Sequence, residues 1–213
     1  YLNTEYLGFY MDSDVPEYQS ELIRQALNYG FDRTKMMKYL RNGIGIPAVG
    51  GFIPKGLPGH NEFDGYDYQP EKAKQLLETY RNESGNQQPE ITLTTSSNYL
   101  SFSEFIQREL QSIGLIINIE VMPPSSLKSA KSNGKIDLFR ASWVADYPDA
   151  QNYLSLFYSG NFAPNGPNYT HFKDAQFDVW YEQAMLETDK TKRINLYQKM
   201  DSLVIKKAPV VVL

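Results

Sequence analysis

The sequence predicts an α/β layer structure, in which strands and amphipathic helices alternate along the chain. Short apolar or alternating segments are typical of strands, and the segments between them carry apolar residues at helical spacing. This alternation favours a sheet covered by helices. The 213 residues have an ordinary globular composition, 41% hydrophobic and 22% charged, and we expect one domain over residues 1–213.

The first third of the chain predicts a strand, helices and a long loop. Residues 5–11 read as a strand, and residues 16–30 show helical spacing that ends at a glycine. Asp32 is placed to cap a short helix that extends to residue 40. Residues 42–59 contain six glycines and three prolines and therefore predict a long loop.

The middle third alternates between helix and strand. Pro70 suits the first position of a helix over residues 70–82, and residues 91–95 alternate as a strand. Ser101 and Glu104 fit a capping box for a helix that ends at Gly114. The elements expected next are a strand at 115–122, a short helix at 126–132 and a strand at 136–143.

The last third is predicted to be mainly helical. The expected elements are a short helix at 152–158, a loop at 159–169, amphipathic helices at 174–187 and 191–206, and a strand at 209–213. Within the loop, the aromatic and amide side chains of residues 161–171 either close on a ligand or pack against the body of the protein.

The composition excludes several classes of function. The net charge is −4 and no basic stripe is present, which argues against a nucleic-acid partner. No apolar run reaches the ~20 residues that span a bilayer. The chain has no cysteine, and its only histidines, His60 and His171, are far apart in the sequence, so we expect no metal site. No glycine loop has the spacing that binds phosphates, so we expect no cofactor. The first residue is Tyr1 rather than Met, so we expect a piece of a longer protein.

Residues 143–149, with the sequence WVADYPD, are the strongest candidate for a site. They follow a predicted strand, and ligands of α/β sheets bind beyond the carboxyl ends of strands. A carboxylate between aromatic rings suits a cationic group such as an α-ammonium. Two other interpretations remain open: a structural turn in which Asp149 caps the next helix and Trp143 lies in the core, and a hydrolase that uses Asp146 and Asp149.

The order of motifs resembles the C-terminal lobe of the oligopeptide- and dipeptide-binding proteins of ABC importers, the family 5 solute-binding proteins. The motifs that carry the resemblance are IRQALNY at 23–29 with Asp32-Arg33, GIPA at 45–48, Tyr68 with PEKAKQLL at 70–77, the helix up to Ile113-Gly114, and Asp137, Trp143, DYPD at 146–149 and Asn152. They extend over nearly the whole chain in the order of the family.

The resemblance implies one lobe of a type II periplasmic-binding-protein-like fold, a mixed sheet flanked by helices, with the N-terminal lobe absent from this chain. It implies a monomer that binds a small peptide or peptide-like solute between two lobes without catalysis and passes it to a membrane permease. It places the protein in the periplasm or on the cell surface, with a lipid anchor in the missing part. An oligosaccharide or another solute is the alternative ligand.

The resemblance also implies ligand-binding residues. Asp146 is expected to pair with the peptide's α-ammonium, Trp143 to line the cleft, and Tyr147 to contribute as a third residue. Some members hold the peptide carboxylate with a cation ahead of the helix that begins here near Ser101. Residues 96–99 contain no such cation.

Overall fold

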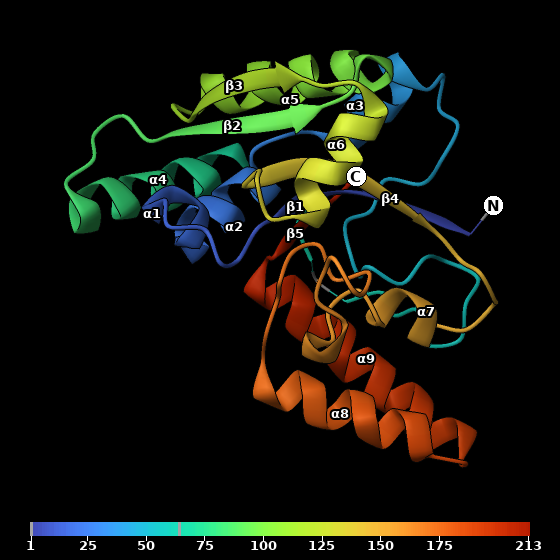
Figure 1. The fold of residues 1–213 in the computed structure, drawn as a ribbon. Coiled ribbons are helices and arrows are strands. Elements are labelled where there is room, and N and C mark those ends of the chain that lie inside the picture. The colour runs from blue at the N-terminus through green and yellow to red at the C-terminus, as the bar shows by residue number, and fades with distance from the viewer. Residues whose placement is uncertain (1, 64) are drawn as a thin grey trace.

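The computed structural model describes residues 2–63 and 65–213, and this part of the chain forms one mixed sheet with helices on both faces (Figure 1). The strands are β1 (Asn3–Phe9), β2 (Glu90–Thr95), β3 (Ile116–Val121), β4 (Leu138–Val144) and β5 (Val210–Val212). Their order in the sheet is β3-β2-β4-β1-β5. β2 is parallel to β3 and β4, whereas β1 is antiparallel to β4 and β5. The expected mixed α/β sheet is confirmed.

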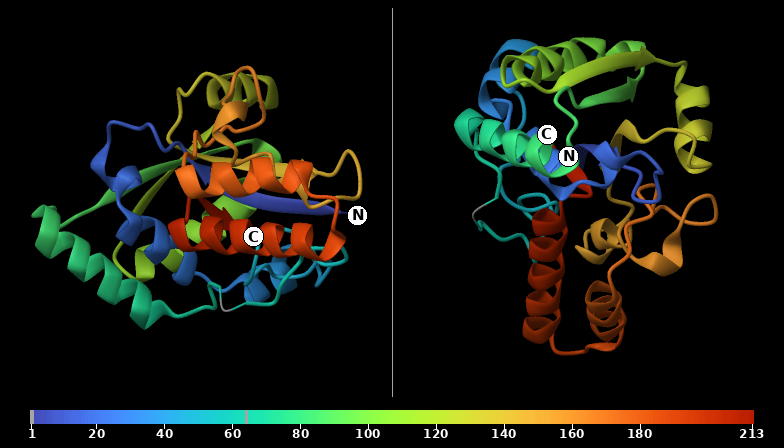
Figure 2. Two further views of the ribbon diagram at one scale, coloured as in Figure 1. Left: turned by 90° about the horizontal axis from the view of Figure 1, so that it is seen from below. Right: turned by 90° about the vertical axis from the view of Figure 1, so that its left-hand side faces the viewer.

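The helices divide between the two faces of this sheet. They are α1 (Pro16–Gln19), α2 (Glu21–Tyr29), α3 (Arg33–Leu40), α4 (Pro70–Ser84), α5 (Leu100–Ser112), α6 (Pro124–Ser132), α7 (Gln151–Leu154), α8 (Ala175–Leu186) and α9 (Lys190–Lys207). Side chains of α2, α4 and α5 form a buried cluster with Leu7 and Leu93, and those of α7, α8 and α9 form a second cluster with Tyr6 and Phe139. Figure 2 shows α8 and α9 on the opposite side of the sheet from α5. None of the described helices combines the length and the apolar character needed to cross a bilayer.

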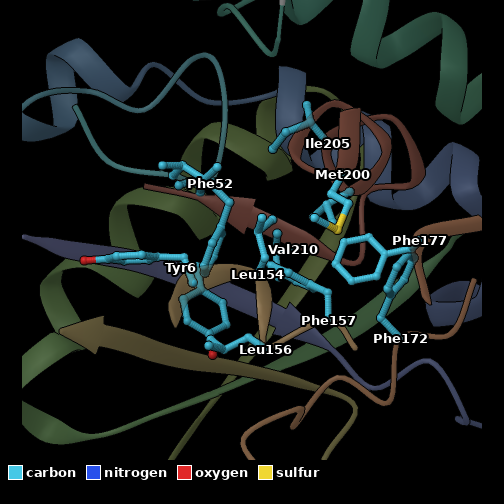
Figure 3. Close-up of a cluster of buried hydrophobic side chains, with 14 of the residues drawn as sticks. Tyr6, Phe52, Leu154, Leu156, Phe157, Phe172, Phe177, Met200, Ile205 and Val210 are labelled. Carbon is cyan, nitrogen blue, oxygen red and sulfur yellow. The ribbon is translucent and has the colours of Figure 1, made fainter. Parts of the chain in front are cut away.

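The second cluster is rich in aromatic rings, as Figure 3 shows. Phe52 packs edge-on against Tyr6 and Phe157, with ring centroids 5.2 and 4.9 Å apart. Edge-to-face pairs of this kind add to the stabilisation from burial alone. The ring of Phe139 occupies space over Gly8, where an added Cβ would lie 2.7 Å from the ring. The abundant aromatic residues of the sequence therefore serve largely to fill this core.

Two predicted helix boundaries differ from the structure because of local capping. Residues 16–30 form two helices, since Ser20 is extended and its side chain accepts a hydrogen bond from the N–H of Ile23 to begin α2. The predicted capping box at Ser101 is wrong: α5 begins at Leu100, directly after a 3₁₀ turn at Ser97–Tyr99, and shows no side-chain cap. A continuous turn ahead of the helix leaves no position for such a cap.

The aspartate caps are clearer signals in this sequence. Asp32 caps α3, as predicted, by accepting a hydrogen bond from the N–H of Lys35. Asp174 caps α8 and Asp189 caps α9 in the same way. The helix expected at 152–158 is shorter, a single turn, and a 3₁₀ turn at Ser159–Asn161 follows it.

Two buried arginines connect α2 and α3 to the C-terminal part of the chain. The Nε–H of Arg33 donates to the Val212 carbonyl at 2.6 Å, and its other nitrogens donate to Asn28 and to the carbonyl of Tyr66. Arg24 donates to the carbonyls at the C-terminal end of α9. Burial lowers the pKa of Arg33 to about 9. The resemblance motif at residues 23–33 thus contains residues that hold the fold together.

The predicted long loop lies between α3 and α4 and is fixed by a buried carboxylate. Asp201 of α9 is fully buried and accepts hydrogen bonds from the N–H groups of Phe52, at 2.7 Å, and Ile53, at 3.4 Å. A Cβ on Gly51 would overlap this carboxylate, so only glycine fits there. The loop therefore delivers Phe52 into the aromatic core instead of staying free on the surface.

Candidate functional site

The candidate site lies at the edge of the sheet where β2, β3 and β4 end. These three strands are parallel, so the segments after Thr95, Val121 and Val144 all emerge on the same side. β1 begins at this edge, with Asn3 paired to Val144. Residues 143–149 therefore lie where a ligand of an α/β sheet is expected.

Asn152 of α7 holds the loop after β4 in place. Its side-chain oxygen accepts hydrogen bonds from the indole N–H of Trp143, at 2.7 Å, and from the backbone N–H of Asp146, at 3.3 Å. Asn152 is itself buried, and the backbone N–H of Ala145 donates to the carbonyl of Leu2. One buried amide thus fixes both the ring of Trp143 and the backbone of Asp146.

Trp143 and Asp146 differ in their exposure. Trp143 is half-buried, with its ring packed on the edge of the aromatic core. Asp146 is exposed, and its carboxylate makes no hydrogen bond or ion pair with any residue in 2–63 or 65–213. An exposed carboxylate, on a loop whose backbone and a nearby indole are bonded to the same amide oxygen, can take a cationic group from outside the chain.

Tyr147 has an intramolecular partner, although half of its surface is exposed. Its hydroxyl donates to the side-chain oxygen of Gln151, and the amide group of Gln151 donates to the hydroxyl of Tyr181. A ligand that bound the Tyr147 hydroxyl would compete with this chain of hydrogen bonds, whereas the face of the ring remains available.

Asp149 has the structural role that the sequence left open. Its carboxylate accepts a hydrogen bond from the N–H of Gln151, the first residue of α7, at 2.8 Å, although the N-cap position of this helix is Ala150. It also faces Tyr197, whose pKa is raised by burial and by its hydrogen bond to Asp149. Of the two carboxylates in the DYPD motif, Asp149 is committed to the turn and only Asp146 is free of internal bonds within the described residues.

A second group at this edge escaped the sequence analysis. Arg140 of β4 forms an ion pair with Glu5 of β1, and its guanidinium carbon lies 3.3 Å from the ring centroid of Tyr99. A second guanidinium, that of Arg41, lies 3.9 Å from the same Glu5 carboxylate. Burial lowers the pKa of Arg140 to about 10, so this guanidinium remains charged at neutral pH. Residues 96–99 contain no cation themselves. β4, which lies beside β2 in the sheet, places the guanidinium of Arg140 on the ring of Tyr99.

Arg140 and Trp143 lie on opposite faces of β4, because side chains alternate along a strand. The Nε of Arg140 is buried without a hydrogen-bond partner among the described residues. A cavity of about 30 Å³ lies beneath the guanidinium. Its apolar walls come from Leu7, Met36, Met37, Phe102, Ile106 and Leu213. Nothing in the sequence around Arg140 signals its pairing with Glu5, since that pair depends on the register of two distant strands.

The loop at 161–171 is fastened to the body of the protein. Asn168 is fully buried, and its amide nitrogen donates to the carbonyls of Tyr158 and Phe172. Phe162 stacks on His171 with ring centroids 4.5 Å apart. Of the two interpretations of this loop, these contacts favour the structural one.

No group of three or more His, Asp or Glu side chains in the part of the chain that the structure describes is arranged to hold a metal ion. The two histidines have other contacts: His60 with the carbonyl of Ile53, and His171 with Asp12 and the carbonyl of Ala163.

Comparison with known proteins identifies relatives of the chain. It is 25% identical over 205 residues to a probable di/tripeptide-binding protein of Pseudomonas aeruginosa. The aligned residues make up 93% of this chain and 38% of that protein. It is 29% identical over 220 residues to the dipeptide-binding protein DppE of Bacillus subtilis, covering 96% of this chain and 39% of the relative. A haem-binding protein A of Haemophilus influenzae is 27% identical, over 98% of this chain and 38% of the relative. The chain thus spans less than two fifths of the length of these relatives.

Solved structures have the same fold. A periplasmic binding protein DppA from Helicobacter pylori, in complex with the peptide STSA, matches all of this chain and 41% of its own, with a TM-score of 0.88 at 24% identity. The murein tripeptide-binding protein MppA in its unliganded open form matches 99% of this chain and 41% of its own, with a TM-score of 0.86 at 22% identity. The expected fold, part of a periplasmic binding protein, is confirmed.

The family model described as "Bacterial extracellular solute-binding proteins, family 5 Middle" matches residues 1–165, more than three quarters of the chain. This match includes Trp143, Asp146 and Asn152, and it confirms the family that the motifs resemble. The chain belongs to the family 5 bacterial extracellular solute-binding proteins.

Proposed function

We propose that this chain is the C-terminal lobe of an extracytoplasmic solute-binding protein and forms one wall of a cleft for a small peptide. The observation that carries the proposal is the exposed Asp146 carboxylate, free of internal partners among the described residues, beside a Trp143 ring that Asn152 holds in place. A peptide N-terminus supplies the cation that such a carboxylate lacks. Relatives named for di- and tripeptides support the choice of ligand.

The three proposed ligand-binding residues have different roles. Asp146 binds the α-ammonium by a charge-assisted hydrogen bond, and Trp143 forms an apolar wall beside it. Tyr147 contributes the face of its ring, since its hydroxyl is bonded to Gln151. Arg140 lies on the other face of β4, where its charge is paired with Glu5, and it is not one of the proposed ligand-binding residues.

The rest of the protein completes this function. We propose that an N-terminal lobe outside this chain forms the other wall, in agreement with relatives whose length this chain covers by 38–39%. The two lobes close around the solute by a hinge and release it to the membrane permease of an ABC importer. The protein acts as a monomer without catalysis, in the periplasm or on the cell surface, where a lipid anchor in the absent part would hold it.

The test is the affinity of a polypeptide that contains both lobes for a library of di- to pentapeptides, measured by calorimetry. Asp146→Asn should weaken the best peptide by about 2–4 kcal/mol, or roughly 30- to 1000-fold, because the ammonium loses its charged partner inside a closed cleft. The control is Asp14→Asn, an exposed aspartate beyond the other end of β1, which should leave the affinity unchanged. Unchanged affinity in Asp146→Asn would overturn the role of this residue.

An oligosaccharide is the second candidate ligand, and the aromatic rings of Trp143 and Tyr147 are the observation that favours it. Sugar sites use aromatic platforms with neutral polar groups, so Asp146→Asn would cost far less affinity for a sugar than for a peptide. The same two variants screened against oligosaccharides therefore distinguish the two ligand classes.

A further inference from the structure

A groove runs between α8 and α9, away from the loop that follows β4. The two helices lie side by side in the view from below (Figure 2, left). The groove is open to solvent and has a volume of about 530 Å³. Its lining comes from the end of α8 and the first half of α9: Gln183, Leu186, Glu187, Lys192, Asn195, Leu196 and Lys199.

Leu186 of α8 lines the groove, and both it and Val179 of the same helix are exposed. Leu186 is 85% exposed and Val179 is 47% exposed. Val179, Gln183 and Leu186 are spaced by four and three residues, so they share one face of the helix. Trp180 and Leu196 are half-buried; Leu196 lines the groove, and the ring centroid of Trp180 lies 5.9 Å from Nζ of Lys199. Large apolar side chains that gather on one exposed helix face are typical of interaction surfaces.

Lysines outnumber acidic residues in the lining of the groove. Lys192 and Lys199 line it, and Lys206 continues the same stripe of α9 seven residues further on. The one acidic residue of the lining, Glu187, has a structural contact, because its carboxylate accepts a hydrogen bond from the N–H of Asp189. The lining therefore carries a net charge of +1, with two lysines and one glutamate, whereas the whole chain has a net charge of −4.

Neither acidic residue of α8, Asp178 or Glu182, is among the residues that line the groove. Asp178 accepts hydrogen bonds from the backbone N–H and the hydroxyl of Ser159, and Glu182 accepts one from the hydroxyl of Tyr158. These carboxylates are therefore directed to the 3₁₀ turn after α7. The groove keeps an apolar centre with ammonium groups along its rim.

We infer that this groove docks an acidic, amphipathic helical segment of a partner protein. The concave shape fits a partner helix that lies between α8 and α9. The apolar side chains of the partner helix would pack against Leu186 and Leu196. Lys192 and Lys199 are about 10 Å apart along α9, which equals about two helical turns, so carboxylates seven residues apart on the partner helix can reach both. The inference concerns a surface separate from the proposed peptide site and does not depend on Asp146.

The test is a selection of 15-residue peptides displayed on phage against this chain, followed by measurement of the affinities of the selected peptides. Trp180 reports binding by its fluorescence in a Trp143→Phe background, where it is the only tryptophan. The selected peptides should be rich in Glu and Asp with apolar residues at helical spacing. Their binding should weaken steeply as salt is raised, because the rim charges are exposed.

Charge reversal makes the test specific. Lys192→Glu with Lys199→Glu should weaken the selected peptides at least tenfold and should shift a new selection towards Lys and Arg. Leu186→Ala should weaken them as well, whereas Lys128→Glu, an exposed lysine on α6, is the matched control and should have no effect.

Several results would overturn the inference. One is a selection without acidic bias, and another is a loss of binding that Lys128→Glu reproduces. Sedimentation of the chain with phosphatidylglycerol vesicles that depends on Lys192 and Lys199, without acidic peptides in the selection, would assign the surface to a membrane instead. Concentration-dependent dimers abolished by Leu186→Ala would assign it to a second copy of the chain.

Discussion

Replacing Asp201 by asparagine should change how the stability of this protein depends on pH. The Asp201 carboxylate is fully buried, and burial raises its pKa from the usual value near 3.8 to about 6, although two backbone N–H groups and His60 act in the opposite direction. Between these two pKa values the folded chain holds a proton that the unfolded chain has released. The contribution of Asp201 to stability is therefore lost as the pH rises from about 4 to about 6.

The magnitude follows from the two pKa values. They differ by about 2, which corresponds to a free energy on the order of 3 kcal/mol. Asparagine keeps the shape and one acceptor oxygen for the N–H of Phe52, but it has no proton to lose in this range. Because the unfolded carboxyl is already partly ionised at pH 4, the free energy of unfolding of the native protein, minus that of Asp201→Asn, should fall by about 2 kcal/mol from pH 4 to pH 7.

Urea unfolding at pH 4, 5, 6 and 7, followed by circular dichroism, measures this difference directly. Asp14→Asn is the matched control, because this exposed aspartate should give a difference that stays within about 0.5 kcal/mol over the range. A difference between native protein and Asp201→Asn that is equally flat would refute the assignment of a buried, titrating carboxylate under the loop that carries Phe52.

Two further variants test the hydrogen bonds that shape the fold and the site. Arg33→Lys should lower the free energy of urea unfolding by roughly 2–4 kcal/mol, because one ammonium group cannot bond to the oxygens of Val212, Asn28 and Tyr66 at once. The control is Arg108→Lys at an exposed position, which should cost less than about 0.5 kcal/mol. Asn152→Ala should cost about 1–2 kcal/mol and speed hydrogen exchange of the Trp143 indole N–H, seen by NMR, and unchanged exchange would contradict the role of Asn152.

Much of the fold could be predicted from the sequence because its signals are local. Alternation of apolar residues identified the strands, and the aspartate at residue 32 identified the start of α3. The break at Ser20 was missed because apolar spacing continues through it, and the break depends on one serine side chain that begins a new helix. The order of the strands in the sheet depends on pairing between distant segments, which periodicity does not reveal.

The candidate site was only partly predictable. The segment from Trp143 to Asp149 stood out by its composition and by its place after a strand, and the structure confirms that position. Asn152 entered the sequence analysis as one position of a family motif, and the structure shows it as the residue that fixes the loop. Arg140 could not be found from the sequence, since its pairing with Glu5 depends on the register of β1 against β4.

The central claim, that Asp146 binds the α-ammonium of a peptide, is tested most directly by a double-mutant cycle. The affinity of a two-lobe polypeptide and its Asp146→Asn variant is measured for the best tripeptide and for the same tripeptide with an acetylated N-terminus. We predict that each change alone weakens binding at least 30-fold and that the two changes together add little, a coupling of about 2 kcal/mol or more. A coupling below about 0.5 kcal/mol, or an acetylated peptide that binds the native protein as tightly as the free one, would contradict the claim.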